Sequence, residues 1–247
     1  MALGTLAKGP VAPFLAAVVI VLFAAATREL RLIFKTLWLP GILLFCAIAA
    51  PWYVAVQVQN PQFFREFILE HNLARFSSNL YHHPEPFWYY LPVTALALVP
   101  WIIFVATAMT ESVRIWWNEG RTSRPDYDLK LQFRIFACCW LIVPVAFFSL
   151  SRSKLPGYIL PAVPAGAILL ADFLLSRFES DLNIPKPLAV VHSLVASIPI
   201  IPAALVGFLV IDHRLPGGRP MVYALAVTLI LSIAISVTLV SPLRLRM

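Results

Sequence analysis

Long apolar segments alternate with short polar segments along almost the whole chain. A helix that crosses a bilayer needs about 20 mostly apolar residues, and about seven segments approach or reach that length. They cover approximately residues 10–27, 37–56, 87–108, 132–150, 158–176, 187–211 and 220–241. Prolines interrupt many of them, but neighbouring helices in a bundle can satisfy the carbonyls that a proline frees. The pattern predicts an all-α, polytopic transmembrane helix bundle of about seven spans, with residues 1–247 forming a single transmembrane domain.

The composition argues against a water-soluble protein. Of 247 residues, 60% are hydrophobic and only 13% are charged, and the mean hydropathy is +0.83. Soluble domains carry about 25% charged residues. The same values argue against disorder and against a basic arm that binds nucleic acid. Cys46, Cys138 and Cys139 are odd in number and lie in apolar segments, so they imply no disulfide framework.

The distribution of Lys and Arg predicts the orientation. If the amino terminus lies outside, 12 of the 19 Lys and Arg residues fall on the inner side and 7 on the outer side. This asymmetry has the direction of the positive-inside rule. A competing interpretation treats Lys8, the first apolar segment and Ala24-Ala25-Ala26 as a secretory signal peptide, which would invert the topology that follows.

The longest polar segment on the predicted outer side covers residues 57–86. The apolar spacing between Phe63 and Phe76 suits a short amphipathic helix on the membrane surface. Glu70, His71 and Arg75 project from this helix, and His71 and Arg75 share a face because they are four residues apart. The alternative is a solvated helix with a local Glu–Arg pair.

Two shorter polar segments are also placed outside. The turn SLSRSKLPGY holds Arg152 and Lys154 among three serines, and these side chains could bind a phosphate. The alternative is a polar hairpin whose long side chains reach the membrane surface. Lys8, followed by Gly-Pro at the start of the first span, is either an interfacial anchor or an anion contact.

Other polar and aromatic features are interpreted as structural. The sequence Phe-Trp-Tyr-Tyr at 87–90 is typical of an interfacial aromatic belt, and Trp116-Trp117 of an inner-surface anchor. Asp172 and His192 lie near predicted helix ends within reach of water, which argues against a proton relay. His82-His83 lack a ligand spacing, so no metal-binding residues are predicted.

Six sequence strings carry a resemblance to a known family: LAKGP, APWYVAV, EHNLARF, PFWYYLPV, VPW and FFSLSRSKLPGYILPAVPA. In this order they resemble the bacterial polyprenyl-phosphate-dependent glycosyltransferases. This family includes aminoarabinose transferases for lipid A and relatives of the dolichyl-phosphate-mannose protein mannosyltransferases. The aminoarabinose-transferase-like branch is the more similar of the two.

The resemblance implies a C-type glycosyltransferase of the bacterial inner membrane. Such an enzyme takes a sugar from a polyprenyl-phosphate donor at the periplasmic face and transfers it to a lipid A-like or protein acceptor. It implies no nucleic-acid partner and names no cofactor, and it leaves open whether a divalent metal assists in a longer enzyme. The substrate-binding residues that it implies are Lys8, Glu70, His71, Arg75, Arg152, Lys154 and Tyr158.

The chain also departs from the family pattern. Family members are longer and begin with further helices, and their first periplasmic loop carries the acidic residues that activate the acceptor. We therefore expect this chain to be the carboxy-terminal half of such an enzyme, without its catalytic base and inactive alone. The alternative function is a polytopic transporter or membrane scaffold without catalysis. A transporter should carry polar residues near mid-span, whereas these spans are almost purely apolar at their centres.

Overall fold

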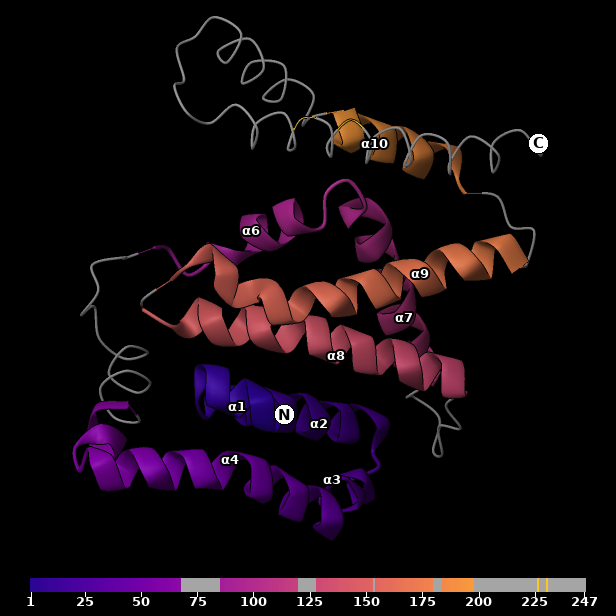
Figure 1. Ribbon diagram of the computed structural model, residues 1–247. Coiled ribbons are helices and arrows are strands. Elements are labelled where there is room, and N and C mark those ends of the chain that lie inside the picture. The colour runs from indigo at the N-terminus through magenta and orange to yellow at the C-terminus, as the bar shows by residue number, and fades with distance from the viewer. Residues whose placement is uncertain are drawn as a thin grey trace, which may run out of the picture. The chain divides into compact units, whose positions relative to one another are not determined.

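The computed structural model describes residues 1–67, 85–119, 128–152, 154–179 and 184–197, and positions 226 and 230. Within these ranges all regular secondary structure is helical (Figure 1). The elements are α1 (Ala2–Lys8), α2 (Val11–Thr27), α3 (Arg31–Thr36), α4 (Leu39–Gln59), α6 (Tyr90–Ala97), α7 (Ile102–Glu119), α8 (Leu129–Leu150), the 3-10 helix η2 (Pro156–Ala162), α9 (Val163–Glu179) and α10 (Lys186–Ser197).

Among the described residues, three stretches are long and apolar enough to cross a membrane: α4, α8 and the continuous helix Pro156–Arg177. The pair α6 and α7 adds a fourth if it counts as one span, although it is bent by 111°. The all-α membrane fold is thus confirmed. The count of about seven spans and the single domain stay predictions, because segments 187–211 and 220–241 lie mostly outside the described residues.

The segment 87–108, predicted as one of the spans that prolines interrupt, is a broken helix pair in the structure. The helix α6 ends at Ala97, and α7 begins only at Ile102. Pro100 lies in this break, and a proline has no N–H to donate to a helical hydrogen bond. In α4 and α8, by contrast, Pro51 and Pro144 are accommodated within continuous helices, as expected for a membrane bundle.

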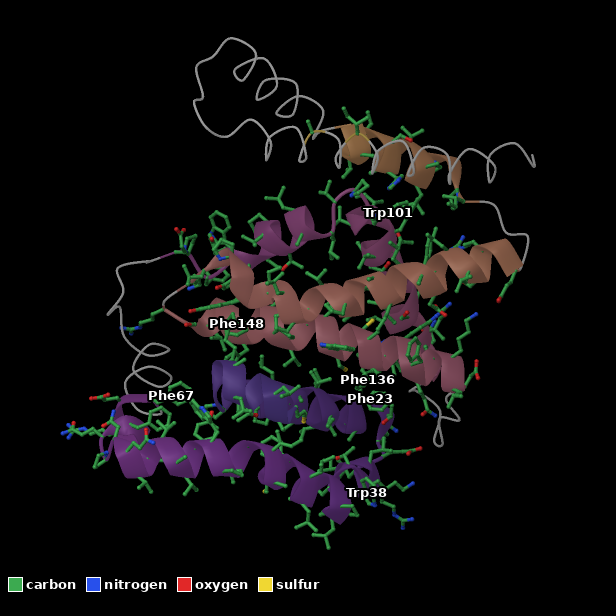
Figure 2. The ribbon with its side chains drawn as sticks, in the orientation of Figure 1. Phe23, Trp38, Phe67, Trp101, Phe136 and Phe148 are labelled. Carbon is green, nitrogen blue, oxygen red and sulfur yellow. The ribbon has the colours of Figure 1, made fainter. Side chains whose placement is uncertain are left out.

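The chain forms two compact units, of which the first comprises residues 1–94 and 111–166. Its core lies between α2 and α8. The α8 contribution recurs every four residues, so that it forms a stripe along one helix face. Phe23 and Phe136 point toward one another across this contact, with ring centroids 5.5 Å apart (Figure 2). The buried core residues are Leu15, Val19, Leu131, Ile135, Cys139 and Val143.

Side-chain hydrogen bonds between described residues connect helices in this unit. The hydroxyl of Tyr53 in α4 donates to the carbonyl of Thr5 in α1 at 2.8 Å. The indole Nε1 of Trp116 donates to the carbonyl of Ala26, near the end of α2, at 2.8 Å. Trp116 also packs against the core. It is therefore a packing residue of the unit, and the interpretation as a simple surface anchor is incomplete.

The second unit comprises residues 95–110 and the part of the chain after residue 166. His192 of α10 is 1% exposed, so the expectation that water reaches it is wrong. Its ring stacks on Phe104, with centroids 4.2 Å apart, and on Trp101, with centroids 5.4 Å apart. Aromatic packing, which the sequence pattern does not reveal, removes this imidazole from water.

Candidate anion-binding site

The candidate site is formed by the turn between α8 and η2. Helix α8 ends at Leu150, and Ser151 is already extended, with φ −68° and ψ 140°. Leu155 is also extended, with φ −131° and ψ 139°, because the residue before a proline avoids the helical conformation. Pro156 then begins η2, where its missing N–H costs no hydrogen bond. Two apolar helices thus enclose a short polar turn, as the sequence predicts.

Lys154 is the most unusual side chain of this turn. It is only 6% exposed, and its Nζ donates to the carbonyl of Ser151. An ammonium has three donors, and no described carboxylate pairs with this one. A buried charge is costly unless it is paired. Among the described residues, Lys154 therefore has one hydrogen-bond acceptor and no countercharge, and an anion would supply both further acceptors and a countercharge.

The turn borders an open hollow of about 410 Å³. Arg152 is exposed on the same turn and lines the hollow with Lys154. A carboxylate, Glu85, contributes opposite charge to the lining, but no ion pair joins it to either cation in the described chain. The full lining is Glu85, Phe87, Ser149, Leu150, Ser151, Arg152 and Lys154.

Tyr90 holds this turn from the start of α6. Its hydroxyl donates to the carbonyl of Leu155 and accepts from the Leu155 N–H, both at 3.0 Å. The side chain is fully buried. The aromatic-belt interpretation of residues 87–90 is therefore wrong for Tyr90, whereas Phe87 and Trp88 are exposed as a belt requires. The sequence carries no signal that separates Tyr90 from Tyr89, because burial depends on the helix that approaches from elsewhere in the chain.

Tyr158 links the turn to the start of the chain. Its N–H donates to the Leu155 carbonyl at 3.1 Å, and its ring centroid lies 5.1 Å from that of Phe148, in the last turn of α8. The Nζ of Lys8 lies 6.0 Å from the Tyr158 ring centroid. Lys8 is exposed and ends α1, and Gly9 follows it with φ 73°. This left-handed conformation suits glycine and lets the chain turn immediately after the lysine.

The structure thus brings together two pairs of the predicted site residues, Lys8 with Tyr158 and Arg152 with Lys154. The other three, Glu70, His71 and Arg75, lie outside the described residues, as does most of the predicted surface helix. Within the described chain, His, Cys, Asp and Glu form no group of three that could hold a metal ion. The substrate-binding roles of all seven residues stay predictions.

Known proteins resemble this chain in sequence, although no model of a protein family matches it. One relative is the undecaprenyl phosphate-alpha-4-amino-4-deoxy-L-arabinose arabinosyl transferase of Photorhabdus laumondii, 34% identical over 172 residues, or 69% of this chain and 29% of the relative. A second relative, the undecaprenyl phosphate-alpha-4-amino-4-deoxy-L-arabinose arabinosyl transferase 1 of Pseudomonas fluorescens, is 32% identical over 180 residues. The match covers 72% of this chain and 30% of the relative. The chain therefore spans about 30% of the length of the curated relatives that it matches.

The fold is also similar to a solved structure. The crystal structure of ArnT from Cupriavidus metallidurans bound to undecaprenyl phosphate matches with a TM-score of 0.68 and 26% sequence identity. The match covers 98% of this chain and 42% of that protein. It thus extends beyond the aligned sequence segments to nearly all of the helices described above. Sequence and fold together show that the chain is homologous to part of the polyprenyl-phosphate-dependent membrane glycosyltransferases.

Proposed function

We propose that this chain forms the donor-binding part of an enzyme that transfers a sugar from a polyprenyl phosphate to an acceptor. The observation that carries this proposal is the buried ammonium of Lys154, which no described carboxylate pairs, beside Arg152 on an open hollow at the end of the candidate membrane span α8. A polyprenyl phosphate has an anionic head for the hollow and an apolar tail for the bilayer. Both parts of such a donor suit this position.

The two cations have a role in sugar transfer. As the bond between the sugar and the phosphate oxygen breaks, negative charge builds on the departing phosphate. Cations already held in place stabilise that charge more in the transition state than in the ground state. Lys154 supplies a point charge, whereas the guanidinium of Arg152 offers a planar fork of donors that can hold two phosphate oxygens.

We propose the substrates and the cellular location of the reaction by analogy with the relatives. The named relatives act on an undecaprenyl-phosphate-linked 4-amino-4-deoxy-L-arabinose, and we propose a donor of this kind. The proposed acceptor is a lipid A-like lipid, with a protein acceptor as the alternative. The reaction would occur at the periplasmic face of the bacterial inner membrane. The cation distribution supports this side, because it predicts that the turn with Arg152 and Lys154 lies outside.

Binding of undecaprenyl phosphate to the full chain in lipid nanodiscs tests the proposal. Arg152→Ala and Lys154→Ala should each weaken binding by about tenfold or more, because each removes a charge-assisted hydrogen bond. Arg152→Lys should also weaken it, because an ammonium cannot reproduce the fork. The control is Lys130→Ala, an exposed cation in the first turn of α8, about 30 Å along the helix from the turn. Equal affinities for all these variants would contradict the proposal.

The transporter alternative is less well supported. A transporter site at a broken helix should offer polar groups to a cavity. Near the break between α6 and α7, in the part of the chain that the structure describes, the imidazole of His192 is covered by Trp101 and Phe104. The candidate chemistry lies instead in the turn after α8.

A further inference from the structure

We propose that Tyr90 is a positioning residue for the donor phosphate, and this inference rests on the function proposed above. Its hydroxyl fixes the backbone of Leu155 and thereby holds Lys154 at the hollow. Neither the sequence pattern nor a contact with the hollow assigns Tyr90 this role, because Tyr90 is not among the lining residues. It acts through Lys154.

The hydrogen-bond geometry carries the argument. The Leu155 N–H belongs to the peptide group that joins Lys154 to Leu155, and the Leu155 carbonyl belongs to the next peptide group. Tyr90 binds both of these groups through one oxygen, at 3.0 Å each. In an extended segment, which lacks helical hydrogen bonds, these two contacts hold both peptide planes. The backbone on the carboxyl side of Lys154 is therefore held in a single orientation.

The hydroxyl can be separated from the packing of the ring. The Tyr90 ring lies 5.1 Å from Tyr89 and 6.3 Å from Phe148, measured between centroids. A phenylalanine at position 90 would keep these ring contacts and lose both hydrogen bonds. Tyr89 is a matched control, because it is the adjacent tyrosine, is only half-buried and has no hydroxyl hydrogen bond within the described chain.

The expected benefit is preorganisation. A side chain that must be ordered during binding loses conformational entropy, which reduces affinity. With the turn held by Tyr90, the Lys154 ammonium is already in place when the phosphate arrives. Without the hydroxyl, the turn must be ordered during binding, and the contribution of Lys154 falls.

The test measures binding of undecaprenyl phosphate to the full chain in nanodiscs, together with amide hydrogen exchange. Tyr90→Phe should weaken binding by about tenfold and accelerate exchange at the Leu155 amide, while exchange in the middle of α8 is unchanged. Tyr89→Phe should bind like the unsubstituted chain. In a Lys154→Ala background, Tyr90→Phe should cause no further loss, because residues that act through one another are not additive.

Several outcomes would overturn the inference. An independent, additive loss in the Lys154→Ala background would show a general structural role for Tyr90. A Leu155 amide that exchanges freely in the unsubstituted chain would show that its hydrogen bond to Tyr90 is absent, even if Tyr90→Phe failed to fold. If Lys154→Ala weakens binding but Tyr90→Phe does not, only this inference fails. If Lys154→Ala binds like the unsubstituted chain, the proposed phosphate site fails with it.

Discussion

The ammonium of Lys8 lies 6.0 Å from the centroid of the Tyr158 ring, although the two residues are 150 positions apart in the chain. A cation about 6 Å from an aromatic face is attracted by the ring quadrupole. Lys8 ends α1 and Tyr158 lies in η2. Lys8 belongs to the string LAKGP and Tyr158 to the string FFSLSRSKLPGYILPAVPA, both of which resemble the same family. This contact therefore brings the two strings together within one compact unit.

This contact predicts that substitutions at Lys8 and Tyr158 weaken undecaprenyl phosphate binding to different degrees. Tyr158→Phe keeps the aromatic face, whereas Tyr158→Leu removes it, so only Tyr158→Leu should leave Lys8 without its ring. We expect Lys8→Ala and Tyr158→Leu each to weaken undecaprenyl phosphate binding by about threefold to tenfold, and Tyr158→Phe to have a smaller effect. Lys35→Ala, at the end of α3, is an exposed lysine control. The measurement is a binding titration, and a loss with Lys35→Ala as large as with Lys8→Ala would contradict the prediction.

Lys154 should lower the thermal stability of the ligand-free chain and strengthen the binding of undecaprenyl phosphate. An ammonium buried without a carboxylate is destabilising in the absence of ligand. Lys154→Met removes the charge and keeps a flexible side chain of similar length, so the thermal midpoint should stay equal or rise by a few degrees. Binding of undecaprenyl phosphate should fall in the same variant. Thermal unfolding in detergent, with and without undecaprenyl phosphate, measures both effects. A lower midpoint in the absence of ligand would show that Lys154 stabilises the turn by itself.

Trp116 should contribute to the stability of the first unit. Trp116→Phe removes the hydrogen bond to the Ala26 carbonyl, which is one of the last carbonyls of α2 without a helical partner. The expected cost is about 1–2 kcal/mol of unfolding free energy, from the lost hydrogen bond and reduced packing. The neighbouring Trp117 is 57% exposed, so Trp117→Phe should cost less than about 0.5 kcal/mol. Denaturant unfolding of the two variants in detergent makes the comparison.

The predicted orientation can be tested at two exposed helix ends. Gln59 ends α4 on the predicted outer side, and Asn118 lies at the end of α7 on the predicted inner side. In a chain whose own cysteines are replaced, Gln59→Cys should react with a membrane-impermeant thiol reagent in intact cells. Asn118→Cys should react only after the membrane is opened. The reverse pattern would favour the signal-peptide interpretation of the first segment.

The sequence alone predicts the class of fold and the two cations of the candidate site. The apolar segments predicted at about 37–56, 132–150 and 158–176 favour helices in a bilayer, because backbone polar groups have no water partners there. The short polar turn after α8 is also visible from the pattern, because Arg152 and Lys154 interrupt two apolar helices. These features depend on residues close together in the chain.

Only the tertiary structure decides which residues are buried and which meet. Tyr89 and Tyr90 are adjacent and chemically identical, but only Tyr90 faces Leu155, because α6 approaches the turn from 65 positions earlier in the chain. His192 is covered because the α6–α7 break brings Trp101 and Phe104 against α10. Burial and long-range contact depend on the packing of several helices at once. The hydrophobic pattern specifies each helix separately and does not contain that information.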